Sequence, residues 1–495
     1  MADTPNLSTV DAPAGSIEGR IDVDGIHSFL GLPYAEAPTG PRQFAPPVRR
    51  ARWTDTLDAT EYRSTAPQRQ SEGPLAGVLP NVIIPGDDYL NLNVWSPDPT
   101  AALPVMVFIH GGSWTTGSGA VDGYNGRAFA RDGVVLVTIN YRLGVDGFLW
   151  FGEGPANLGL LDQITALEWV RDNIAAFGGD SSQVTVFGES SGAMSIGALL
   201  AMPAARGLFH RAILESGAAR HVVDTASARL VATRLAAILG VAASREAIAA
   251  VPRERILAAQ SQLATEVSKK PRKKLWGDFA ANGLPFEPVI DGVSLPRHPL
   301  RAIEDGVAAD IDILIGSNSQ EAMILLAPLG VGKVKRWLLP FVAIRAGLPP
   351  LRATNVFRRE LPGGRAADHV SNMLTDWIYR VPAIRIAESH PRSHVYEFAW
   401  GSPAFDGELG ACHGVELPFV FDTLASSDWD ILAGKDAPQA LAENVHRAWV
   451  AFATTGDPGW PAYSREDRQV MNFDIVSSLT IDPRATSRHL WELHR

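Results

Sequence analysis

Six short apolar runs, rich in β-branched residues, constrain the fold of this chain more than any other feature. Each run is continuous rather than alternating, which is typical of strands that are covered on both faces, as in a mainly parallel sheet. The runs cover residues 104–110, 134–141, 184–188, 212–215, 311–315 and 394–400. They predict a buried sheet in the middle of the molecule.

Helical patterns fall between these runs. The clearest pattern has apolar residues at spacings of three, four and seven, which form one stripe: Leu160, Ile164, Leu167, Ile174 and Phe177. Asn157 precedes the stripe and is expected to cap the helix. Strands that alternate with helices predict an α/β fold, with a mainly parallel central sheet flanked by helices.

The domain organisation is predicted to be simple. A chain of 495 residues could hold two or three domains, but no repeat and no low-complexity linker divides it. We therefore expect a single domain over residues 1–495. Residues 224–282 and 321–376 favour helices and follow predicted strands, where loops carry function in such sheets. We interpret them as cap-like helical insertions over the active site.

Charge and composition exclude several classes of partner. The net charge of −10 argues against nucleic acid or an anionic membrane surface as the main partner. The single cysteine, Cys412, cannot form an intrachain disulfide, so a reducing compartment suits the chain. The first 15 residues do not resemble a secretory signal, and no apolar run has the length of a membrane-spanning helix. We expect a cytoplasmic protein.

The pentapeptide Gly188-Glu189-Ser190-Ser191-Gly192 follows one of the strand runs and precedes a helix-forming segment. It matches G-x-S-x-G, a sharp turn that lifts a serine hydroxyl clear of the sheet, and the glycines let strand and helix approach closely. A purely structural turn is the alternative for the pentapeptide alone. Its position after a strand favours a catalytic role, so Ser190 is the candidate nucleophile.

A second glycine turn follows the first strand run, at His110-Gly111-Gly112-Ser113. Acyl-transfer enzymes stabilise an oxyanion with backbone N–H groups in such a turn, and the residue after the nucleophile supplies another donor. The candidate donors are the N–H groups of Gly112, Ser113 and Ser191. Two glycines after a strand are common in ordinary loops, so this prediction depends on the pentapeptide downstream.

A serine nucleophile needs a base within hydrogen-bond reach. His413 lies on a loop of small residues after the run 394–400, where it can reach the end of the sheet. The acid lies between nucleophile and histidine in this chain order, and Glu321 follows the run 311–315. A single histidine or glutamate in a loop is more often structural, so the residues alone leave both assignments open.

Further motifs extend over nearly the whole chain, and with them the sequence resembles the type-B carboxylesterases, which include bacterial para-nitrobenzyl esterases and cholinesterases. The matching segments are 29–35, 87–95, 140–144, 159–163, 177–180, 413–419 and 455–458. The resemblance implies an α/β-hydrolase fold with a triad of Ser190, Glu321 and His413. It also places Gly112, Ser113 and Ser191 on the oxyanion-hole positions, and Glu189 and Ser216 on polar positions that support the triad.

The resemblance implies a serine carboxylic ester hydrolase that cleaves small to medium neutral esters through an acyl-enzyme. It implies no cofactor, no metal and no obligatory protein partner. The alternatives are a catalytically silent scaffold or adhesion protein, and a lipase or amidase of the same fold. The filled triad positions disfavour a silent protein. Residues 67–88 contain no aromatic side chain, whereas cholinesterases bind quaternary ammonium with a tryptophan there, which disfavours a choline-ester specialist.

Overall fold

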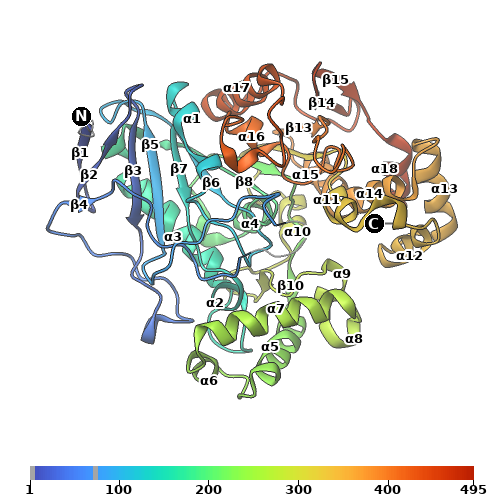
Figure 1. Cartoon of the computed structure of the whole chain (residues 1–495), viewed down its shortest axis with the longest axis horizontal. Helices are drawn as coiled ribbons and strands as arrows, with labels where there is room; N and C mark the ends of the chain where they lie inside the picture. Colours follow the sequence, from blue (N-terminus) through green and yellow to red (C-terminus); the bar gives the residue numbers. More distant parts are fainter. Residues whose placement is uncertain (1–5, 71–75, 495) are drawn as a thin grey trace.

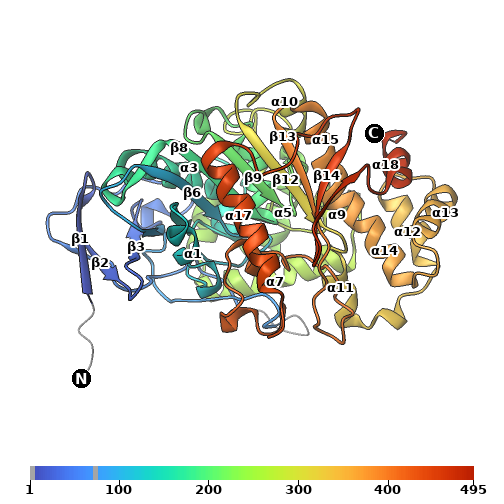
Figure 2. The same cartoon turned by 90° about the horizontal axis from the view of Figure 1, so that it is seen from above.

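A sheet of 13 strands runs through the molecule, with helices on both faces (Figures 1 and 2). The structure, a computed structural model, describes residues 6–70 and 76–494. Residues 1–5, which belong to the N-terminal stretch in which no secretory signal is predicted, lie outside the described residues, as do residues 71–75 within the segment 67–88. The strand order is β1-β2-β3-β5-β7-β6-β8-β9-β12-β13-β14-β15, and β4 pairs with β2.

The central strands are parallel from β7 to β14, and all six predicted runs form strands among them. These are β6 (Leu103–Ile109), β7 (Val135–Ile139), β8 (Gly179–Glu189), β9 (Arg211–Glu215), β12 (Asp312–Asn318) and β13 (Ser393–Phe398), followed by β14 (Gln469–Phe473). After the first two residues of β6, the apolar side chains of β6, β7 and β8 are almost completely buried, as continuous apolarity predicts. The α/β-hydrolase fold is thereby confirmed.

Antiparallel strands complete both edges of the sheet. They are β1 (Asn6–Ala12), β2 (Gly15–Ile21), β3 (His27–Pro33) and β5 (Asn91–Ser96) at one edge and β15 (Ser478–Ile481) at the other. Short strands elsewhere are β4 (Leu57–Asp58), β10 (Val223–Asp224) and β11 (Val289–Ile290). The sequence did not predict these strands, because β4, β10 and β11 have only two residues each and the others are interrupted by polar residues or glycine.

The expected helix with the apolar stripe is α3 (Leu158–Asn173), which continues as a 3-10 turn over Ile174–Phe177. Asn157 occupies the N-cap position, but its side chain does not cap the helix and that prediction is wrong. Its Oδ1 accepts from the N–H of Val289 at 2.7 Å, and its Nδ2 donates to the carbonyl of Val289 at 2.9 Å. Asn157 therefore fixes the start of α3 to β11.

The two predicted insertions are helical. The first contains α5 (Thr225–Leu239), α6 (Arg245–Ala249), α7 (Arg253–Lys269), α8 (Lys273–Trp276) and α9 (Phe279–Asn282). The second contains α11 (Met323–Leu326), α12 (Leu338–Arg345), α13 (Pro350–Glu360) and α14 (Ala366–Thr375). The second group has a small apolar core of its own with α18 (Ala485–Glu492). Their role as caps, and the single domain, stay predictions.

The remaining helices pack on the sheet or on other helices. They are α1 (Arg127–Arg131), α2 (Gly144–Phe148), α4 (Ser191–Leu199), α10 (Pro299–Glu304), α15 (Val381–Ser389), α16 (Leu417–Val420) and α17 (Gln439–Thr455), and a π-helical turn spans Asp376–Arg380. Within the described ranges, no helix has both the length and the apolar content that crossing a bilayer requires.

Candidate active site

The turn between β8 and α4 carries Ser190 at the carboxyl end of the sheet. Ser190 has φ 55° and ψ −123°, a conformation that a non-glycine residue rarely adopts. A Cβ atom on Gly188 would lie 2.5 Å from the carbonyl oxygen of Ile109, and one on Gly192 only 1.9 Å from it. Both glycines are therefore required by the close approach of this turn to β6.

Three predicted residues are joined by hydrogen bonds at this turn. The Oγ atom of Ser190 lies 2.8 Å from Nε2 of His413, and Nδ1 of His413 lies 2.6 Å from Oε2 of Glu321. Glu321 is fully buried and His413 is 9% exposed. A serine, a histidine and a carboxylate in this order have the geometry of an activated nucleophile.

The loops that carry Glu321 and His413 are fastened to each other through their backbones. The N–H of His413 donates to the carbonyl of Glu321 at 3.2 Å. The N–H of Gln320 donates to the carbonyl of Ala411 at 3.0 Å, and the side chain of Gln320 accepts from the N–H of Ala411 at 3.2 Å. These bonds hold the turn Ser319-Gln320-Glu321-Ala322 in place and thereby orient the carboxylate.

A group of buried polar residues surrounds the histidine. Oε1 of Glu189 lies 3.1 Å from Nε2 of His413. The hydroxyl of Ser216 donates to Oε1 of Glu416 at 3.2 Å. The side-chain amide of Asn318 donates to the other oxygen of Glu416 and, at 2.8 Å, to the carbonyl of Cys412. The predicted residues Glu189 and Ser216 both belong to this group.

Sequence reasoning missed three residues of the site, Asn318, Glu416 and Tyr379. The ring of Tyr379 packs against the ring of His413, with centroids 5.0 Å apart. Glu416 lies in a family-like segment three residues after His413, and that position was the signal that could have identified it. Nothing local distinguishes Asn318 or Tyr379, because their roles depend on contacts between distant segments.

Burial and charge change the proton affinities of this group. Burial raises the pKa of Glu189 to about 8 and the pKa of Glu416 to about 7. Burial also lowers the pKa of His413, but the carboxylates of Glu189 and Glu321 outweigh that effect, and the net result is a pKa raised to about 10. His413 and Glu189 therefore compete for a proton.

The second glycine turn lies beside the nucleophile. Gly112 has φ +109° and Ser113 has φ +56°. The N–H of Trp114 donates to Oγ of Ser191 at 3.2 Å, which fastens the turn to α4. Ser191 is the first residue of α4, where a backbone N–H has no intrahelical partner. The three predicted donor residues are thus close together at one end of α4.

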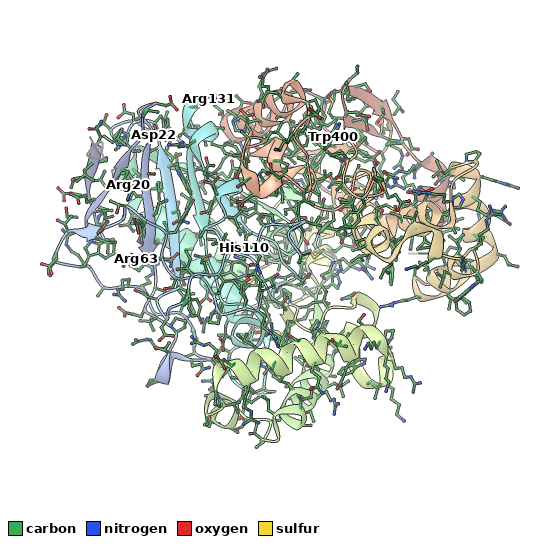
Figure 3. The ribbon with its side chains drawn as sticks, in the orientation of Figure 1. Arg20, Asp22, Arg63, His110, Arg131 and Trp400 are labelled. Atoms are coloured by element: carbon green, nitrogen blue, oxygen red, sulfur yellow. The ribbon has the colours of Figure 1, made fainter. Side chains whose placement is uncertain are left out.

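A cavity of about 240 Å³ opens onto this turn. Gly112, Ser113, Glu189 and His110 form one side of it, and Figure 3 shows His110 near the centre of the molecule. The rest of the lining is mostly apolar and includes Val78, Leu79, Val121, Tyr124, Ile324 and Leu417. Glu189 directly precedes Ser190 in the chain, so the cavity can hold a small organic molecule beside the turn that carries the nucleophile.

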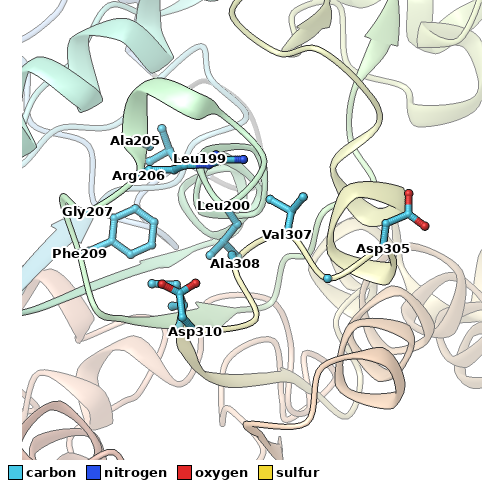
Figure 4. Close-up of a pocket in the computed structure, with 12 residues that line it drawn as sticks. Leu199, Leu200, Ala205, Arg206, Gly207, Phe209, Asp305, Val307, Ala308 and Asp310 are labelled. Carbon is cyan, nitrogen blue, oxygen red and sulfur yellow. The ribbon is translucent and has the colours of Figure 1, made fainter.

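A second cavity of about 430 Å³ lies elsewhere (Figure 4). Its lining includes Leu199 at the end of α4, Phe209 before β9 and Ile311 before β12. It is therefore at the amino ends of these strands, whereas Ser190 is at the carboxyl end of β8, with α4 between them. This cavity has no contact with the triad residues.

The chain is similar to one protein family over most of its length. The model of the carboxylesterase family matches residues 6–335 and 358–491. The para-nitrobenzyl esterase of Bacillus subtilis (strain 168) is 37% identical over 494 residues, which cover 96% of both chains. The phenmedipham hydrolase of Pseudarthrobacter oxydans is 36% identical, covering 92% of this chain and 93% of the relative.

Solved structures that resemble this chain belong to the same group of proteins as the relatives found by sequence. The crystal structure of a carboxylesterase from Geobacillus stearothermophilus at pH 6.2 superposes with a TM-score of 0.85 at 34% identity. The match covers 98% of this chain and 99% of the other. A para-nitrobenzyl esterase structure gives the same TM-score, identity and coverage.

Proposed function

Since the chain belongs to the carboxylesterase family and is a serine carboxylic ester hydrolase, we propose that Ser190, His413 and Glu321 form its catalytic triad. The continuous hydrogen bonds Ser190–His413–Glu321 carry this proposal. Ser190 attacks the ester carbonyl while Nε2 of His413 takes its proton. Glu321 holds the imidazole in the correct tautomer and stabilises the imidazolium that forms.

The oxyanion of the tetrahedral intermediate needs donors that are already in place. The N–H groups of Gly112, Ser113 and Ser191 take this role, supported by their place on one turn and on the first turn of α4. His413 then returns its proton to the leaving alcohol, which leaves an acyl group on Ser190. Water, activated by the same histidine, hydrolyses the acyl-enzyme.

The substrates we propose are small to medium neutral esters. The cavity of about 240 Å³ has a mostly apolar lining, and Glu189 is its only acidic lining residue within the described part of the chain. One relative is named for the hydrolysis of para-nitrobenzyl esters and the other for the hydrolysis of phenmedipham, so both names indicate small organic substrates. A lipase or an amidase remains the second candidate, since the fold supports both. A cytoplasmic location and the absence of nucleic-acid or obligatory protein partners stay predictions.

Hydrolysis of para-nitrophenyl esters from acetate to palmitate tests this proposal. We expect the highest kcat/KM at short to medium acyl chains and none for the matching anilides. The Ser190→Ala variant should lose at least about 10³-fold in kcat. Full activity in that variant would refute Ser190 as nucleophile, whereas a preference for palmitate or for anilides would indicate the lipase or the amidase.

A further inference from the structure

Helix α12 exposes a row of large apolar side chains. Trp337, which directly precedes it, and Phe341 and Ile344 within it are 62%, 60% and 61% exposed. Their spacing of four and three residues places them on one face. The rings of Trp337 and Phe341 contact edge to face, with centroids 5.7 Å apart. Such a patch on a protein surface indicates an interaction site.

Exposure of this row is not required by the packing of α12. The opposite face of the helix already fills the small apolar core that α12 shares with α13, α14 and α18, since Leu339 and Ala343 are completely buried there. Leu351, at the start of α13, is 79% exposed. A helix that is apolar on both faces is stable when the second face is also covered.

Positive charge gathers around the exposed row. Residues 331–361 contain only one acidic residue, Glu360, in a chain whose net charge is −10, and the basic residues of this segment are Lys333, Lys335, Arg336, Arg345, Arg352, Arg358 and Arg359. Glu360 is engaged elsewhere, because it accepts from the N–H of Ser487 at 2.6 Å. In the part of the chain that the structure describes, none of these basic residues has a carboxylate within 4.0 Å.

Three of the arginines line a cavity next to the row. Arg336, Arg358 and Arg359 surround a volume of about 300 Å³, together with Asn355 and the buried His369. Guanidinium groups present forked donors that match a phosphate group. Arg336 directly precedes Trp337 in the chain, so the cavity adjoins the apolar row.

The surface lies at the end of the molecule opposite the edge strands β1 and β2. Figures 1 and 2 both show α12 and α13 at the right-hand end, beyond the sheet, with β1 at the left-hand end. A flat partner can therefore approach α12 and α13 without contacting the sheet.

We propose that this end of the protein binds an anionic phospholipid surface. Trp337, Phe341 and Ile344 enter the interfacial layer, and the arginine cavity takes a headgroup phosphate. Interfacial helices combine an apolar face with Lys and Arg in this way, and each basic residue near an anionic membrane adds to the attraction. The net charge of the whole chain predicted no such contact, because it averages this local cluster with acidic residues elsewhere.

Charge favours an anionic bilayer over a second copy of the chain as the partner. Two copies joined through the α12 row would bring their basic clusters together, which like-charge repulsion opposes. Nucleic acid would satisfy the arginines, but it would leave the aliphatic side chains of Ile344 and Leu351 without a matching partner. An anionic bilayer matches both features.

Co-sedimentation of the full chain with vesicles tests the proposal. We expect binding to vesicles that contain phosphatidylglycerol and little binding to pure phosphatidylcholine. The double variants Trp337→Ser/Phe341→Ser and Arg358→Glu/Arg359→Glu should each lower the partition coefficient by at least about tenfold. All substituted side chains are exposed, and hydrolysis of a soluble ester should be unchanged, which reports that the fold is intact.

Matched controls come from other surfaces. Ile481→Ser removes an apolar side chain that is 75% exposed on β15, and Lys269→Glu/Lys270→Glu reverses two exposed charges at the end of α7. Both should bind vesicles as the parent does. The proposal is overturned by absent binding, by equal binding to both vesicle types, or by equal loss in the controls. Self-association or RNA binding that depends on Trp337 and Arg358, without vesicle binding, would equally overturn it.

Discussion

The Oε1 atom of Glu189 lies 3.1 Å from Nε2 of His413, the nitrogen that must accept the proton of Ser190. A carboxylate at that distance stabilises the imidazolium, so it raises the pKa of His413 and retains the proton that the base must lose before the reaction begins. The proposed activity should therefore depend on pH through the pair and not through the histidine alone.

Replacing Glu189 with glutamine should shift the pH profile of ester hydrolysis. Because the raised pKa keeps His413 protonated to higher pH, the parent should gain activity as pH rises above 6.5, the ordinary value of histidine. Glu189→Gln removes one raising charge, so the acidic limb of kcat/KM should move to lower pH. Profiles from pH 5 to 10 measure the shift. Glu443→Gln, on the exposed side of α17, is the control, and an identical limb in both variants would contradict the argument.

Asn318 should stabilise the site as well as the fold. Its side chain bonds the carboxyl group of Glu416 and the carbonyl of Cys412, next to His413. Asn318→Ala leaves both buried acceptors with one donor fewer, which should cost about 1–3 kcal/mol in the free energy of unfolding. Urea titration measures this change. Asn355→Ala, at an exposed position on α13, should stay close to the parent, and an equal effect of the two would remove Asn318 from this role.

The sequence predicts more of the sheet than of the active site. The central strands were predictable because parallel strands buried on both faces consist of continuous runs of apolar residues, such as residues 104–110. Ser190 was predictable because a side chain at Gly188 or Gly192 would clash with the carbonyl oxygen of Ile109. The turn that carries Ser190 therefore needs both glycines of the recognisable motif. Roles that depend on contacts between distant segments, such as the role of Tyr379, were not predictable. Even Asn157 was misread, since its side chain bonds Val289 and not its own helix.

The buried pair of Arg142 and Asp162 should contribute strongly to stability. The two side chains are 1% and 0% exposed, and two hydrogen bonds of 2.7 Å join the guanidinium to the carboxylate. Arg142→Met leaves Asp162 buried without its partner, which should cost about 3–5 kcal/mol. The exposed pair of Arg171 and Asp172 is the matched control, and Arg171→Met should cost at most about 1 kcal/mol. Similar denaturation midpoints for both variants would contradict this difference.

Choline esters should be turned over no better than neutral esters of equal acyl length. In the described lining of the cavity of about 240 Å³, Tyr124 is the one residue among the phenylalanine, tyrosine and tryptophan types, and a quaternary ammonium group is held best between several such rings. Comparing kcat/KM for butyrylcholine and for a neutral butyrate ester of similar size measures the preference. A strong preference for the cation would show that Tyr124 and Glu189 suffice to bind it.

Ser113 should act through its backbone N–H and not through its hydroxyl. Its φ of +56° lies in the left-handed region, which glycine adopts without strain and which proline, with φ near −65°, cannot adopt at all. A proline variant would therefore distort the turn, and side-chain removal is the cleaner test. Ser113→Gly should keep the backbone donor and the turn, so kcat should stay within a few-fold of the parent. Ser113→Ala keeps the same N–H and loses only the hydroxyl, so it should behave alike apart from slight strain. If instead both variants lose about 10²–10³ in kcat, the loss of one oxyanion-hole donor, then the hydroxyl is the donor and the assignment of the backbone N–H is wrong.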